Sequence, residues 1–173
     1  MYRHFLFFHL FVCTAMVGCS QPSDWSDHTR VLPDELRELP VGAVLLHSPN
    51  PNYAELNETP KQSDTKYVWK HAATVMALDK ALQVVKAGSY IWYSEAGWQR
   101  NVQYSRRDFA KRFRCPKGKL EPGVRYTFEK NYRYGDVDYG GDALWYVIAE
   151  DADGNRYKGI GLIETESYSP NKN

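Results

Sequence analysis

Residues 143–165 decide the fold. Two apolar runs, ALWYVIAE (143–150) and YKGIGLIET (157–165), are separated by the polar segment DADGN (151–155) and Arg156. Both runs are rich in β-branched and aromatic residues, which favour strands. Asp153-Gly154 is a strong signal for a tight hairpin, because these residues accept the left-handed backbone conformations of such turns. We therefore predict two antiparallel strands joined at Asp153-Gly154.

Similar short runs recur on the N-terminal side of this hairpin. We predict strands in the segments 41–46, 68–78, 82–94 (a pair, divided at Gly88), 98–104 and 124–134. About seven strands over roughly 100 residues, with turns every 8 to 12, are typical of an antiparallel β-sandwich. Residues 48–65 carry three prolines and little periodicity, so we expect a long loop or partly ordered arm there.

One local pattern narrows the fold class. The segment Leu120-Glu121-Pro122-Gly123-Val124-Arg125-Tyr126 resembles the tyrosine corner of fibronectin type III and other immunoglobulin-like domains. The resemblance implies that the Tyr126 hydroxyl bonds to backbone a few residues upstream. We therefore expect an all-β protein, an antiparallel β-sandwich of immunoglobulin-like type, with one or two short helices.

Two helices are predicted between the strands. Pro33 to Leu39 places a proline and two acids in the first turn of a short helix. Ser105-Arg106-Arg107-Asp108 is a variant of the capping box, with Asp in place of Glu or Gln. Phe109 and Phe113 would share one face of the helix that follows, which we expect to run from Arg106 to about Phe113.

Positive charge is concentrated around that second helix. Between Arg106 and Lys119 there are seven bases and one acid, although the whole chain has a net charge of only +1. Such a patch could bind anionic headgroups, lipopolysaccharide phosphates or an acidic partner, or it could be a solvated helix face. The residues that we expect to bind a partner here are Arg106, Arg107, Lys111, Arg112 and Arg114.

Tyrosines supply the second candidate surface. Tyr132, Tyr134 and Tyr139 fall where a predicted strand gives way to a loop with Gly140 and Gly141. Exposed tyrosines in a polar loop suit contact with a sugar or peptide, because their rings bury a large area at a small entropic cost. The alternative is aromatic packing on a twisted sheet. We expect these three tyrosines to join the basic helix in one partner-binding surface.

Metal and catalytic sites are not expected. The histidines outside the N-terminal segment, His28, His47 and His71, lack the spacing of a zinc site, and no cofactor motif is present. Cys115 and His71 could in principle form a nucleophile and base, but no orienting acid is evident. We therefore expect no enzyme activity, and a thiol-dependent enzyme or sensor is the third functional alternative.

The N-terminal segment has the features of a targeting signal. Phe5 to Val17 is too short an apolar run to span a bilayer comfortably, and it matches the apolar region of a signal peptide. It ends at Met16-Val17-Gly18-Cys19, which resembles the lipobox of bacterial lipoprotein precursors. The resemblance implies cleavage before Cys19, lipidation of its thiol and anchoring in the membrane through the lipid. Ser20 in place of Asp favours the outer over the inner membrane.

These observations predict four segments: a signal peptide (1–18), a lipidated tether and arm (19–66), a β-sandwich domain (67–168) and a tail (169–173). Cys13 would leave with the signal peptide and Cys19 would carry lipid, so Cys115 would have no disulfide partner. The small net charge and the envelope location disfavour nucleic acid. We expect a lipid-anchored cell-envelope module that binds a protein, a glycan or another envelope component. The alternative is a structural subunit of an envelope complex, with residues 48–65 laid across a neighbour.

Overall fold

The computed structural model describes residues 30–58 and 64–169. Most of this part of the chain is extended, with two short α-helices and one 3₁₀ turn. In chain order the elements are α1 (Asp34–Arg37), β1 (Val41–Ser48), β2 (Asn52–Leu56), β3 (Tyr67–Trp69), β4 (Ala72–Ala77), β5 (Leu82–Tyr93), β6 (Gly97–Ser105), α2 (Arg106–Arg112), η2 (Pro116–Gly118), β7 (Lys119–Leu120), β8 (Tyr126–Phe128), β9 (Arg133–Gly135), β10 (Gly141–Glu150) and β11 (Arg156–Glu166).

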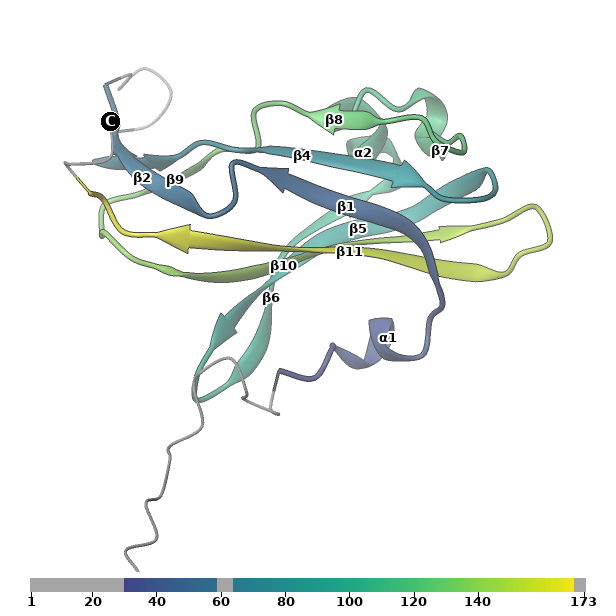
Figure 1. Cartoon of the computed structure of the whole chain (residues 1–173), viewed down its shortest axis with the longest axis horizontal. Coiled ribbons are helices and arrows are strands. Elements are labelled where there is room, and N and C mark those ends of the chain that lie inside the picture. Colours follow the sequence, from purple (N-terminus) through teal and green to yellow (C-terminus); the bar gives the residue numbers. More distant parts are fainter. Residues whose placement is uncertain (1–29, 59–63, 170–173) are drawn as a thin grey trace, which may run out of the picture.

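The strands form one connected sheet of 11 strands, whose main path runs in the order β6-β5-β10-β11-β1-β4-β8. Strand β1 lies between β11, to which it is parallel, and β4, to which it is antiparallel. Strand β2 also pairs in parallel with the end of β11, and it leads through β3 to β9. Figure 1 shows β2 and β9 together at the left end of the sheet, and β8 and α2 along its upper edge.

Strand β10 is buried on both faces because a helix covers each of them. Along a strand, successive side chains point to opposite faces. Val147 and Ala149 belong to the core cluster that contains Phe109 of α2, whereas Tyr146 and Ile148 belong to the cluster that contains Leu36 of α1. Figure 1 shows the two helices on opposite sides of the sheet. A continuous apolar run such as 144–149 is what a strand in this position requires.

Polar contacts hold α1 against the sheet. Glu35 pairs with Lys86 and accepts a hydrogen bond from the Tyr90 hydroxyl. On the far side of the helix, Lys158 donates to the Leu36 carbonyl at 2.8 Å and satisfies one of the carbonyls left free at a helix end. These contacts make α1 part of the folded unit.

The predicted hairpin and its turn are confirmed. Strands β10 and β11 pair from Gly141↔Thr165 to Glu150↔Arg156. Gly154 has a φ of 83°, a conformation that favours glycine. The Asp151 carboxylate accepts hydrogen bonds from the backbone of Asp153 and Asn155, both at 3.0 Å, which closes the turn.

Several predicted boundaries are wrong. Residues 48–65 were expected to be a loop, yet they include β2, which pairs with β3 and β11. The boundary between a 19–66 arm and a 67–168 domain therefore does not hold, since β1 and β2 lie in the same sheet as the later strands. The segment 124–134 forms only two three-residue strands, and 82–94 forms one continuous strand. Gly88 does not divide β5; it makes room for the Val102 carbonyl, which would lie 2.3 Å from a Cβ there.

The all-β class is confirmed, whereas the antiparallel sandwich is not. The strands are linked in one sheet, and two of the pairings are parallel. The hydrogen bond of the tyrosine corner is nevertheless present, because the Glu121 backbone N–H donates to the Tyr126 hydroxyl at 3.4 Å. That contact is local, and it does not by itself determine how the strands are ordered.

Candidate functional site

Helix α2 has the predicted start and the predicted buried face. The Asp108 N–H donates to the Ser105 hydroxyl at 3.2 Å, and the Ser105 N–H donates to the Asp108 carboxylate at 3.3 Å. Phe109 and Phe113 are buried and stacked, with ring centroids 4.4 Å apart. Because these rings fix which face points inward, the charged side chains of the helix point outward.

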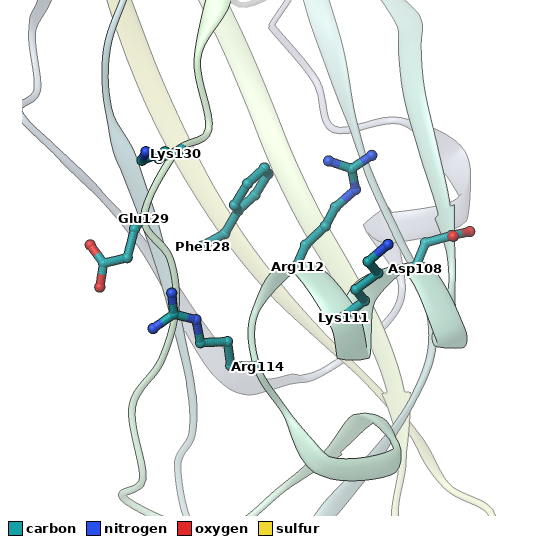
Figure 2. A pocket seen from close by; sticks show the side chains of 7 residues that line it. All are labelled: Asp108, Lys111, Arg112, Arg114, Phe128, Glu129 and Lys130. Atoms are coloured by element: carbon teal, nitrogen blue, oxygen red, sulfur yellow. The ribbon is translucent and has the colours of Figure 1, made fainter.

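An open basic groove of about 420 Å³ lies between α2 and the strand β8. This depression is called the basic groove below. It is lined by Asp108, Lys111, Arg112, Arg114, Phe128, Glu129 and Lys130. Figure 2 shows Asp108, Lys111 and Arg112 on one side, Arg114, Glu129 and Lys130 on the other, and Phe128 between them. Four bases and two acids give this lining a formal charge of +2.

One aromatic ring, that of Phe128, lines the groove, and Arg112 packs against it. The guanidinium of Arg112 lies over two rings, 4.5 Å from the centroid of Tyr104 and 5.4 Å from that of Phe128. These cation–π contacts are attractive and stabilise the position of the Arg112 guanidinium. The hydrogen bond from the Ser105 hydroxyl lowers the pKa of the Asp108 carboxyl below its usual value.

The structure brings together three of the five basic residues that the sequence suggested. Lys111, Arg112 and Arg114 line the groove, whereas Arg106 and Arg107 do not. Arg106 instead donates from Nε to the Val84 carbonyl at 3.1 Å, so it ties α2 to the sheet. Phe128, Glu129 and Lys130 also line the groove but were not predicted from the sequence. The available signal was a charged pair, Glu129-Lys130, directly after an apolar residue of a predicted strand.

A second depression contains two of the three expected tyrosines. This aromatic pocket of about 580 Å³ is lined by Tyr134 and Tyr139 together with Trp92 and Tyr93 of β5, while Tyr132 lies outside it. Tyr139 packs over the buried Trp69 with ring centroids 4.4 Å apart, and 44% of Tyr139 is exposed. The tyrosines and the basic helix line two different depressions, which share no lining residue.

Two histidines pack together inside the sheet: His71 is buried, and His47 is half-buried with both ring nitrogens shielded from solvent. His47 of β1 and His71, between β3 and β4, have ring centroids 5.4 Å apart, and His47 also contacts the Trp145 ring at 6.0 Å. Burial lowers the pKa of His47 to about 4 and that of His71 to about 3, so both rings are neutral at pH 7. The Asn52 amide lies 3.3 Å from Nδ1 of His71 and can donate to that nitrogen in the neutral ring.

Cys115 and His71 do not come together as a nucleophile and base. The Cys115 thiol donates to the Lys119 carbonyl at 3.0 Å, whereas the His71 ring contacts His47 and Asn52. Burial raises the pKa of Cys115 to about 11, which opposes formation of the thiolate nucleophile. Within residues 30–58 and 64–169, no group of three or more His, Cys, Asp or Glu side chains is arranged to hold a metal ion.

Cys19, the expected lipidation site, lies outside the described residues. In the part of the chain that the structure describes, no helix is both long enough and apolar enough to traverse a bilayer. No protein-family model matches the chain, and no curated protein matches it significantly.

Proposed function

We propose that the protein is a lipid-anchored cell-envelope binding protein, and that its basic groove receives an acidic segment of a partner protein. The observation that carries this proposal is the groove itself, where Lys111, Arg114 and Lys130 surround the half-buried ring of Phe128. A carboxylate can pair with these bases, and an adjacent apolar side chain can pack on the ring. Both interactions strengthen when water is excluded from the contact.

The distribution of charge supports a protein partner over a membrane surface. Asp108 and Glu129 stand among the bases of the groove, and both would face an anionic surface pressed against it. A flat anionic layer would be repelled by these acids, whereas a peptide can place its own charges between them. The bases also have no competing partner: Lys111, Arg114 and Lys130 take part in none of the ion pairs found within the described residues.

The anchor in this proposal is Cys19, which follows the lipobox-like Met16-Val17-Gly18. Acyl chains on this residue would hold the protein at a membrane, since more than one chain suffices for stable attachment. We expect Cys19→Ser to move the protein from the membrane fraction to the soluble fraction and to abolish labelling by a palmitate analogue. A Cys19→Ser protein that stays in the membrane fraction would show that the anchor is wrong.

The groove is tested by cross-linking in intact cells with a charge-reversed variant, Lys111→Glu/Arg114→Glu/Lys130→Glu. These side chains are exposed, so the variant should fold with unchanged thermal stability within a few degrees. The matched control is Arg107→Glu/Lys117→Glu/Arg125→Glu, which makes the same change of charge at exposed positions outside the groove.

We expect one cross-linked partner that is recovered with the wild type and the control and is lost with the groove variant. Its recovery should also fall at high salt, because the Debye length shrinks from about 10 Å at 0.1 M to about 3 Å at 1 M. If the groove variant retains the partner, or if the control loses it equally, the groove is not the binding site.

A further inference from the structure

A cationic side chain without an acidic partner lies in the wall of the aromatic pocket. Arg133 of β9 lines the pocket, and its guanidinium carbon lies 5.1 Å from the centroid of the Trp145 ring. Its Nη2 atom is buried without a hydrogen bond, and no carboxylate pairs with Arg133 within the described residues. Buried charges in proteins are normally paired, because leaving one unpaired costs several kcal/mol.

Arg133 is the unpaired charge in the wall of the aromatic pocket. The one carboxylate in the lining, Asp142, is paired with Arg30. His47 and His71, which interact electrostatically with Arg133, are neutral and offer ring nitrogens but no negative charge. Burial lowers the pKa of Arg133, yet a guanidinium stays protonated at neutral pH. Arg133 is therefore complementary to an anion that enters the pocket.

The rest of the pocket offers ring faces and polar groups. Tyr93 is 53% exposed, and beside it Trp92 is held edge-on against Trp98 at 5.2 Å. Asn101 and Thr165 add polar side chains, and the Asn101 amide donates to Ser89, which leaves its carbonyl oxygen to accept. The volume of about 580 Å³ is within the range of roughly 300–1,000 Å³ that small-molecule sites occupy.

We propose that the aromatic pocket binds a carboxylate-bearing sugar, with the carboxylate on Arg133 and a face of the sugar ring against the exposed Tyr93, since the Trp92 ring is already covered by Arg30 and Trp98. Because Nη2 is buried, the carboxylate would accept a charge-assisted hydrogen bond from another N–H of the Arg133 guanidinium. The Tyr93 ring covers the C–H face of a pyranose, and the acceptor on Asn101 serves a ring hydroxyl. A flat aromatic acid would leave these polar groups without partners.

This inference goes beyond the proposed function, since the pocket and the basic groove are lined by different residues. Two kinds of envelope sugar carry the required chemistry: N-acetylmuramic acid, with a lactyl carboxylate, and a uronic acid such as glucuronic acid. Both sugars carry a carboxylate and a pyranose ring in one small molecule. They differ in how far the carboxylate lies from the ring, so the pocket should prefer one of the two.

The test is titration of the full-length protein, solubilised in a mild detergent, with matched probes followed by saturation-transfer NMR and calorimetry. The pairs are N-acetylmuramic acid against its methyl ester, and glucuronic acid against glucose. We expect one acid to bind about 10- to 100-fold more tightly than its neutral counterpart, which is the range expected for a charge-assisted hydrogen-bonded pair. Equal affinity for acid and neutral probe in both pairs, or no binding of either acid, would overturn the proposal.

Two variants separate the roles of the residues. Arg133→Met should reduce the affinity for the acid to that of the neutral probe, whereas Tyr93→Ala should weaken the acid and neutral probes by similar factors. Tyr93 is exposed, so its replacement should not disturb the fold, and this variant tests the pocket even if Arg133→Met fails to fold. The groove variant Lys111→Glu/Arg114→Glu/Lys130→Glu should bind the acid as the wild type does. Wild-type affinity in Arg133→Met and Tyr93→Ala together would refute the assignment.

Discussion

Mild acid is expected to destabilise this fold through His47 and His71. His71 is buried and the ring nitrogens of His47 are shielded from solvent. Burial lowers the pKa of His47 to about 4 and that of His71 to about 3, from an ordinary value of 6.5. The positive charge of Arg133 contributes in the same direction. In the unfolded chain both rings take up protons as the pH falls below 6.5, while in the folded chain they do not.

The sign and size of the effect follow from this difference. Between the unfolded and folded pKa values the unfolded state binds more protons, so stability is greatest above pH 6.5 and is lost as the pH falls. Each pH unit in this window costs about 1.4 kcal/mol per ring. From pH 7.5 to pH 5 the loss is about 2 kcal/mol per ring, or about 4 kcal/mol for the pair. That is a large part of the 5–15 kcal/mol typical of a domain.

The assay is urea unfolding at a series of pH values, followed by tryptophan fluorescence. Staying above pH 5 avoids the window in which carboxyls such as Glu35, with a reference pKa of 4.5, begin to contribute. We expect the midpoint to fall steadily below pH 6.5 with an unchanged slope of the transition. In the variant His47→Gln/His71→Gln this pH dependence should disappear. A flat wild-type profile, or the same decline in the variant, would refute the reasoning.

Three further outcomes are expected from the packing. Phe113→Ala should lower the free energy of unfolding by about 3–5 kcal/mol, because the ring is buried and stacked; a loss below about 1 kcal/mol in urea unfolding would contradict this. Gly88→Ala should lower the melting temperature by several degrees, since its Cβ would meet the Val102 carbonyl at 2.3 Å, whereas Gly141→Ala has open space and should melt as the wild type does. Cys115 should react with thiol reagents only in urea, because burial raises its pKa to about 11; rapid labelling of the native protein would show otherwise.

The parts of the structure that could be predicted are those with local signals. The hairpin at Asp153-Gly154 and the start of α2 at Ser105 each depend on residues within a few positions of one another. The same is true of the hydrogen bond between Glu121 and the Tyr126 hydroxyl. Each of these local contacts can form in sheets with different strand orders. The hydrogen bond of the tyrosine corner is therefore present although an immunoglobulin-like sandwich is not confirmed.

The order of the strands could not be predicted, because it depends on partners far apart in the chain. Val44 pairs with Ile160 in parallel, and no turn sets that register. The strand β2 was missed because Pro49 and Pro51, just before it, are typical of a loop.

Two candidate surfaces were only partly predicted for the same reason. The chain around α2 shows its charge plainly, but the sequence does not reveal that Lys130 lies across a groove from Lys111. The tyrosine pattern of the sequence did not predict Arg133 as a site residue. Alternation along an extended segment would place Arg133 and Tyr134 on opposite faces, yet both line the aromatic pocket.

The position of β1 also bears on when the protein can fold. Its neighbour β11 (Arg156–Glu166) is synthesised after all the other described strands, so the parallel pair at the middle of the sheet cannot form until these last residues have emerged. Contacts between such distant segments carry a large loop-closure entropy and make folding slow. For an exported chain of the kind proposed here, that delay is useful, because a chain that stays unfolded until its last strand is made can still be threaded across a membrane.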